Sequence, residues 1–145
     1  MNMATFRSFE EIDAWKKARE LTRLVYDVTA KGPFARDFAL RDQIRRASVS
    51  AMSNVAEGHG RRGTREFQQF LSMALGSVNE VCSQLYVALD QGYIDEHAFR
   101  AATDLAQESA SLIGGLARYL RKSELKGSKF ASAAEAKRAT RNQGP

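Results

Sequence analysis

Apolar residues recur every three or four positions through four long segments of the chain, a spacing that places them on one face of an α-helix. Glycine and proline separate these segments, at residues 32–33, 58–63 and 92. The core-facing positions are Ala14, Ala18, Leu21, Val25 and Val28; Leu40, Ile44, Ala47, Ala51 and Asn54; Phe67, Leu71, Ala74, Val78, Val81, Leu85 and Ala88; and Phe99, Ala102, Ala106, Ser109, Ile113, Leu116 and Leu120. Because short connections make sequential helices antiparallel, the pattern predicts an all-α fold, an antiparallel up-down-up-down four-helix bundle.

Residues favoured at helix ends set the expected boundaries. Ser8 and Glu11 have the spacing of a capping box at the first helix. Gly58 is placed to close the second helix, which is expected over about residues 35–57, in the left-handed conformation. Thr64 is expected to cap the third helix, and the fourth is expected to start near Asp95.

The positive charge of the chain is concentrated at its C-terminal end. The formal net charge is +5, yet residues 1–120 carry 15 Lys or Arg and 15 Asp or Glu, whereas residues 121–145 carry 7 and 2. This last segment has too few large apolar residues to form a core, so we expect a bundle over residues 1–121 and a flexible, disordered basic tail over residues 122–145. The tail either aids solubility or contacts RNA, a ribosome or DNA.

Composition excludes several classes of protein. A single cysteine, Cys82, forms no disulfide within the chain and fits a reducing compartment. No apolar run approaches the roughly 18 residues of a membrane span, so we expect a cytoplasmic protein without membrane contact. His59 and His97 lack cysteine or acidic neighbours at metal-ligand spacing, so we expect neither a metal nor a cofactor.

The second predicted helix has an unusual outer face. No charged residue occurs between Arg46 and Glu57, and Val49, Met52 and Ala56 form a second apolar stripe on roughly the opposite side from the core. A helix that is apolar or small all round is normally buried all round. The stripe therefore predicts a homo-oligomer, and the alternative is a Ser- and Ala-rich helix that tolerates partial exposure.

Arginines form two groups that are candidates for nucleic-acid binding. One lies on the second predicted helix and the other around the turn that follows it, as Arg41, Arg45 and Arg46, then Arg61, Arg62 and Arg65. Gathered by an oligomer, they would form a basic ring able to bind phosphates. Each group also has acidic neighbours, so a mixed, solvated surface is the alternative.

Four other polar residues have expected structural roles. Asn54 on the second-helix seam needs hydrogen-bond partners and is expected to fix register or hold a neighbouring loop. Glu57, near a helix C-terminus, is expected to pair with a nearby arginine, whereas Glu66 suits the first turn of its helix. Glu80 lies mid-helix, where an ion pair or a general base are the alternatives. No arrangement of Ser, Cys or His predicts a catalytic residue.

Motifs distributed over residues 6–120 resemble one known family. They are Phe9-Glu10-Glu11, Trp15 to Ala18, Asp42 to Ser50, Ser53 to Gly58, Arg61-Arg62, Glu66-Phe67, Phe70-Leu71, Ala74, Gly76-Ser77, Glu80, Gln84-Leu85 and Gly92-Tyr93-Ile94. Together they resemble the four-helix-bundle proteins encoded in 23S rRNA intervening sequences. The resemblance implies a homo-oligomer, usually a barrel-like pentamer, and the family name records where genes lie. A distant relative, the accessory variability protein of diversity-generating retroelements, partners a reverse transcriptase and nucleic acid.

Three functions compete at this point. The first is a non-enzymatic oligomeric bundle that binds RNA, or a protein that handles RNA, through the arginines and the tail. The second is an oligomeric scaffold that binds a protein partner on the apolar stripe, with no nucleic-acid role. The third, an enzyme such as a metal-independent ribonuclease, is disfavoured because no arginine lies four to six residues before His59.

Overall fold

The computed structural model describes residues 6–141, with the side chains of all but residues 128–131 in that range. Its elements are the 3-10 turn η2 (Phe9–Glu11) and the helices α1 (Asp13–Thr29), α2 (Gly32–Arg36), α3 (Phe38–Gly60), α4 (Thr64–Asp90) and α5 (Glu96–Arg141). The described part of the chain contains helices and turns but no strand. The predicted all-α fold is therefore confirmed.

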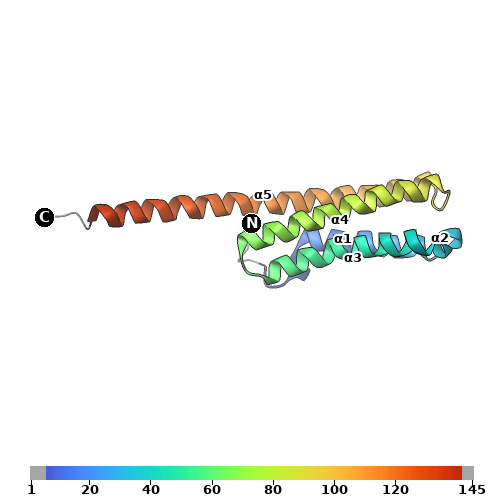
Figure 1. Cartoon of the computed structure of the whole chain (residues 1–145), viewed down its shortest axis with the longest axis horizontal. Helices are drawn as coiled ribbons and strands as arrows, with labels where there is room; N and C mark the ends of the chain where they lie inside the picture. The colour runs from blue at the N-terminus through green and yellow to red at the C-terminus, as the bar shows by residue number, and fades with distance from the viewer. Residues whose placement is uncertain (1–5, 142–145) are drawn as a thin grey trace.

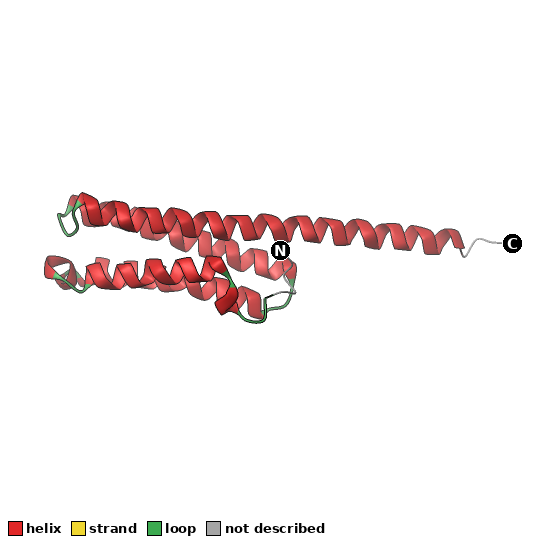
Figure 2. Ribbon diagram, turned by 180° about the vertical axis from the view of Figure 1, so that it is seen from behind, coloured by secondary structure: helices red, strands yellow, loops and turns green. Residues whose placement is uncertain are grey.

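The four long helices form a bundle in which each has two neighbours. Helix α3 packs against α1 and α4, and α5 packs against α4 and α1. In Figure 1 the chain runs along α1, returns along α3, runs out again along α4 and returns along α5, so successive long helices alternate in direction. Short α2 closes the corner between α1 and α3, and Figure 2 shows the connections at both ends.

The core is made of the predicted seams, with two local shifts. At the end of α1 the buried residue is Thr29, and the predicted Val28 is half-buried. All seven predicted positions of α4 are buried, as are the α5 positions from Ala102 to Leu120. In α3 the residues buried after Ala51 are Val55 and Gly58, whereas the predicted Asn54 is only half-buried. Within residues 6–141, no helix combines the length and apolar character needed to cross a bilayer.

Helix ends differ from the expected ones in three places. Ser8 precedes η2, not α1, and its side chain makes no capping bond. The predicted second helix is divided into α2 and α3, because Asp37 begins α3 by accepting a hydrogen bond from the Leu40 amide at 3.1 Å. Thr64 is the first residue of α4 and follows Gly63, so it is not the cap. The fourth helix begins as expected: Asp95 Oδ1 accepts from the Ala98 amide at 2.8 Å.

Gly58 lies inside α3, and the prediction that it closes the helix in a left-handed conformation is wrong. The residue is buried, and a Cβ built on it would lie 2.7 Å from Phe70 Cβ and 2.9 Å from Phe67 Cδ1. A glycine here lets α3 and α4 approach closely just before they turn. The left-handed residue of this turn is Arg62, with φ of 62°.

Helix α5 extends far beyond the bundle (Figures 1 and 2). Its core contacts end at Leu120, and residues 122–141, which we name the arm, continue as helix. This differs from the expected disordered tail at residues 122–145, of which 142–145 lie outside the described residues. The arm has no proline and is rich in Ala, Lys, Glu and Arg, which favour helix even without a core. At 1.5 Å per residue its 20 residues span about 30 Å.

Candidate nucleic-acid interface

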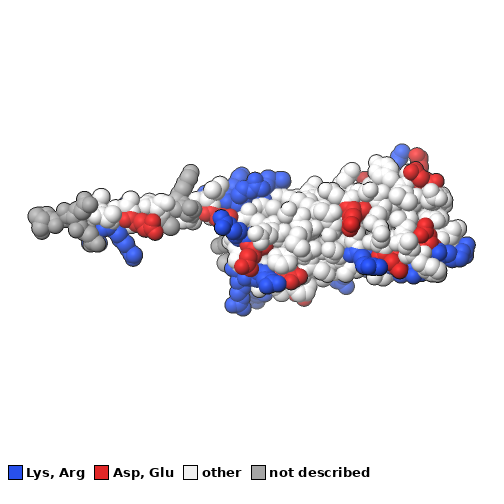
Figure 3. Space-filling model, viewed as in Figure 1, with Lys and Arg blue, Asp and Glu red and all other residues white. Residues whose placement is uncertain are grey.

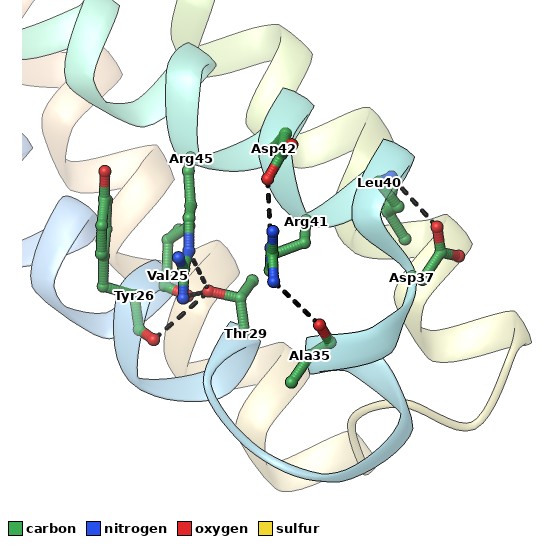
Figure 4. Close-up of polar contacts among 9 residues, drawn as sticks. All are labelled: Val25, Tyr26, Thr29, Ala35, Asp37, Leu40, Arg41, Asp42 and Arg45. Atoms are coloured by element: carbon green, nitrogen blue, oxygen red, sulfur yellow. Dashed lines mark hydrogen bonds and ion pairs between the residues drawn. The ribbon is translucent and has the colours of Figure 1, made fainter.

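Arg41, at the start of α3, is engaged by contacts within its own corner of the bundle. Its Nε lies 3.1 Å from Asp42 Oδ1, and its Nη1 donates to the Ala35 carbonyl at 3.0 Å (Figure 4). Its guanidinium carbon also lies 4.7 Å from the centre of the Phe38 ring. One carboxylate thus balances its charge, and its contacts hold α2 against α3. Arg41 therefore contributes more to the packing of this corner than to the binding of an external ligand.

Arg45, one helical turn further, is held without a carboxylate. Its Nε donates to Thr29 Oγ1 at 2.8 Å, and its guanidinium carbon lies 4.5 Å from the centre of the Tyr26 ring. Thr29 is buried, and its hydroxyl contacts the carbonyls of Val25 at 2.7 Å and Tyr26 at 3.2 Å (Figure 4). The described residues give Arg45 no ion pair, so its charge is fixed in position and not neutralised.

Arg46, the next residue of α3, lies between two hollows of the surface. It is exposed and lines two shallow hollows, one with Tyr26 and Arg45 and the other with Glu80 and Gln84. No ion pair within 4.0 Å links it to a described carboxylate. The first arginine group therefore contains one neutralised member and two that present charge.

The second group surrounds the turn between α3 and α4. Arg61 Nη2 lies 3.0 Å from Glu57 Oε1, which is the ion pair expected for Glu57, and its guanidinium carbon lies 5.4 Å from the Phe70 ring centre. Arg65 Nε lies 3.5 Å from Glu124 Oε1 on α5. Arg62 is exposed at the turn itself.

The structure does not bring the two groups together within one chain. Arg46 and Arg61 are 15 residues apart on or just past one helix, which is about 22 Å at 1.5 Å per residue. Instead, the Arg65–Glu124 contact places the turn beside the point where α5 leaves the bundle. We name residues 57–66 and 118–126 the basic end.

The basic end includes cations of α5 that the sequence grouping missed. They are Arg118, Arg121, Lys122 and Lys126. Together with Arg61, Arg62 and Arg65, seven Lys or Arg face three Glu in these two segments, a formal excess of four positive charges. Figure 3 shows the largest area of Lys and Arg on this face where α5 leaves the bundle, and acidic residues lie among the cations. Only the pairing of α4 with α5 reveals this cluster, because its two halves are more than 50 residues apart.

Of the polar residues with expected structural roles, Asn54 is hydrogen-bonded, whereas Glu66 and Glu80 lie exposed. Asn54 Nδ2 donates to the Ser50 carbonyl at 2.9 Å and to Ser50 Oγ at 3.0 Å, and Ser77 Oγ of α4 donates to the same hydroxyl at 2.9 Å. Asn54 is thus linked to α4 through Ser50 and holds no loop. Glu66 lies exposed in the first turn of α4, where a negative charge suits the helix dipole. Glu80 lies exposed on α4, outside the core.

The apolar stripe of α3 faces outward from the bundle. Val49 is 38% exposed, and Met52 and Ala56 are half-buried. These side chains are uncharged, and Met52 also packs partly against the core. The stripe is therefore open to another molecule in the single chain.

Reactive side chains are sparse in the described part of the molecule. The His59 ring lies edge-on to Phe6 and Phe67, with centroid distances of 6.5 and 6.2 Å, and its Nε2 is 3.4 Å from the Phe6 carbonyl. Burial raises the pKa of the Cys82 thiol, which disfavours the reactive thiolate. Among residues 6–141, no three His, Cys, Asp or Glu side chains are grouped so that they could hold a metal ion.

Comparison with known proteins assigns the chain to a family. The model of the 23S rRNA-intervening sequence protein family matches residues 10–115. A solved structure from Bacteroides thetaiotaomicron, a protein of unknown function from the S23 ribosomal protein family, shares the fold with a TM-score of 0.67 and 21% identity, over 72% of this chain and 95% of that one. No curated protein matches the chain. Because the family model matches most of this chain and the structure is a helical bundle, the chain belongs to the 23S rRNA-intervening sequence protein family.

Proposed function

We propose that this chain is a non-enzymatic, homo-oligomeric bundle that binds RNA, or a ribonucleoprotein, through its arginine groups and the arm. The observation that carries the proposal is the basic end, where seven cations meet three carboxylates at the base of the arm. Cations that outnumber nearby acids attract the phosphate backbone, because binding releases the counterions condensed on it. A reduced Cys82 and the absence of a second cysteine suit an assembly in the cytoplasm.

The arm extends this surface away from the bundle. Its described cations include Lys122, Lys126, Lys137, Arg138 and Arg141, and all of them are exposed. Its two acids, Glu124 and Glu135, are fewer, and Glu124 is already engaged by Arg65 and by Gln68 Nε2 at 2.8 Å. A helix about 30 Å long with this balance offers phosphates several contacts in a row.

Assembly is the second part of the proposal, and the apolar stripe supports it. Burying Val49, Met52 and Ala56 against a neighbouring copy removes apolar surface from water. An assembly of five copies would have a mass of about 80 kDa, from 16.1 kDa per chain. Light scattering after size exclusion measures this mass, and we expect Val49→Glu to lower it. Val87→Glu, at an exposed valine of α4, is the matched control.

RNA binding is tested by fluorescence anisotropy with a labelled single-stranded RNA at low and at moderate salt. We expect binding that weakens steeply with salt, and weaker binding by the variant that combines Arg61→Gln, Arg62→Gln, Lys122→Gln and Lys126→Gln. Arg100→Gln, at an exposed arginine near the far end of the bundle, is the control. Absence of binding at low salt would refute the proposal.

A protein partner is the second candidate, and the exposure of Val49 at the apolar stripe favours it. Such a partner would bind in a salt-tolerant manner and would be displaced by Val49→Glu. Catalysis is a third possibility that the same RNA preparation tests. Hydrolysis of the labelled RNA that is lost in His59→Ala would show an enzyme, and we expect no hydrolysis.

A further inference from the structure

A shallow hollow lies between α1 and α3, far from the basic end. It is lined by Tyr26, Asp42, Arg45, Arg46, Val49 and Ser50, and we name it the Tyr26 hollow. We infer that the Tyr26 hollow binds one nucleotide of single-stranded RNA, with the phosphate at Arg45 and Arg46 and the base against the Tyr26 ring. This inference rests on the proposed RNA function and assigns a nucleotide subsite within it.

Arg45 is the anion-binding group of the hollow, because the fold holds it in place without a counter-charge. Its Nε bond to buried Thr29 and its contact with Tyr26 fix the guanidinium plane. The nearest acid in sequence, Asp42, is engaged by Arg41 at 3.1 Å. The terminal nitrogens Nη1 and Nη2 have no bond to a described group and remain available as a pair of donors, the arrangement that suits a phosphate.

Arg46 supplies a second cation at the rim. It lines the same hollow, is exposed and lacks an ion pair among the described residues. Two arginines at consecutive helix positions point in directions about 100° apart, so one phosphate between them has to lie over the groove between their side chains. Ser50 adds a neutral hydroxyl to the lining.

Tyr26 supplies the surface for a base. The ring is 43% exposed although the Arg45 guanidinium covers one face at 4.5 Å. Bases stack on such aromatic rings in proteins that bind single strands, and a cation on the same ring adds to the attraction. Because a base paired within a duplex does not offer its face, the hollow selects single-stranded RNA.

The experiment compares two labelled probes of equal length, a single-stranded 12-nucleotide RNA and an abasic ribose-phosphate oligomer. Binding to the full chain is measured by anisotropy at one salt concentration. We expect Tyr26→Leu to weaken RNA binding on the order of tenfold and binding of the abasic oligomer much less, because the bond to Thr29 still holds Arg45. Tyr26→Phe keeps the ring and should bind as the unchanged chain does. Tyr86→Leu, at a 58% exposed tyrosine of α4 that packs against Phe99 and has no arginine over its ring among the described side chains, is the matched control.

Arg45→Lys tests the phosphate contact. Lysine keeps the charge but loses the planar fork, so we expect several-fold weaker binding of both probes. Arg19→Lys, at an arginine that lies 5.7 Å from the Trp15 ring, is the control. Thermal unfolding shows that each variant is folded.

The outcomes separate this inference from the function on which it rests. If the unchanged chain binds neither probe, both are overturned. If it binds RNA with strong salt dependence and Tyr26→Leu binds equally well, the nucleotide subsite is overturned and the proposed function stands. An equal loss with both probes would assign Tyr26 a purely structural role and would also overturn the subsite.

Discussion

Gly58 is the residue at which the packing of α3 against α4 is most sensitive to one added atom. A Cβ there would lie 2.7 Å from Phe70 Cβ, which is anchored to the backbone of α4, and 2.9 Å from Phe67 Cδ1. Both distances are shorter than the closest approach of two non-bonded carbon atoms, so the helices have to separate. Overpacking of this kind costs about 1–3 kcal/mol.

Helix propensity acts in the opposite direction. Alanine is favoured over glycine by about 1 kcal/mol inside a helix, and Gly58 is two residues before the last residue of α3. We therefore expect Gly58→Ala to lower the free energy of unfolding by up to about 2 kcal/mol. Gly76→Ala is the matched control, because Gly76 lies inside α4 and, apart from the adjoining backbone of its own helix, no atom lies within 4 Å of the added Cβ. It should stabilise the protein by up to about 1 kcal/mol.

Urea unfolding at one fixed protein concentration measures both variants. The fixed concentration matters because assembly would add to the apparent stability. If Gly58→Ala proves as stable as Gly76→Ala, then α3 and α4 are not in close contact at this end, and the geometry described for the turn is wrong.

Three further predictions concern other parts of the fold. The Tyr93 hydroxyl donates to Asp37 Oδ2 at 2.9 Å, and this bond raises the pKa of Tyr93 above its usual value of 10. The stability that the bond contributes is therefore present below pH 10 and is lost as the pH rises through the pKa of Tyr93 in the folded protein. Urea unfolding between about pH 9 and 11 should show a loss of unfolding free energy that Tyr93→Phe lacks. Equal losses in the two proteins would refute the role of this bond. A chain ending at Lys126 should lose helical circular dichroism but keep its unfolding free energy within about 0.5 kcal/mol, because the described side chains beyond Lys126 are exposed; a larger drop would show that this part of the arm stabilises the bundle. Leu71→Ala, in the core of α4, should cost about 2–5 kcal/mol in urea unfolding, and a cost below 1 kcal/mol would place Leu71 outside the core.

Periodicity predicted most of the core but missed a local shift in α3. Phe67 and every later seam position of α4 are buried as expected, because large apolar residues mark that face clearly. In α3 the neighbouring residues are small or polar, so spacing alone did not distinguish Asn54 from Val55. The buried row continues through Val55 to Gly58, since only a residue without a side chain fits against Phe67 and Phe70.

The site was predicted in its parts and not in its arrangement. The arginines were identified from local sequence, but their surroundings come from helices distant in the chain. Tyr26 meets Arg45 across α1 and α3, and Arg65 meets Glu124 across α4 and α5. Such contacts depend on the register between helices, which no local pattern specifies. For the same reason the cations at residues 118–126 were assigned in part to the core helix and in part to a tail.

The salt dependence of RNA binding tests the central claim most directly. Each phosphate contact to a single strand contributes about 0.7 to the slope of log affinity against log salt concentration. Anisotropy titrations at four or five salt concentrations should therefore give a steep slope for the full chain, and Arg62→Gln with Lys122→Gln, at two exposed cations outside the described ion pairs, should reduce it by about 1.4. Two results would contradict a phosphate-binding surface at the basic end. One is no binding at the lowest salt, and the other is a slope of log affinity against log salt that is near zero and unchanged in that variant.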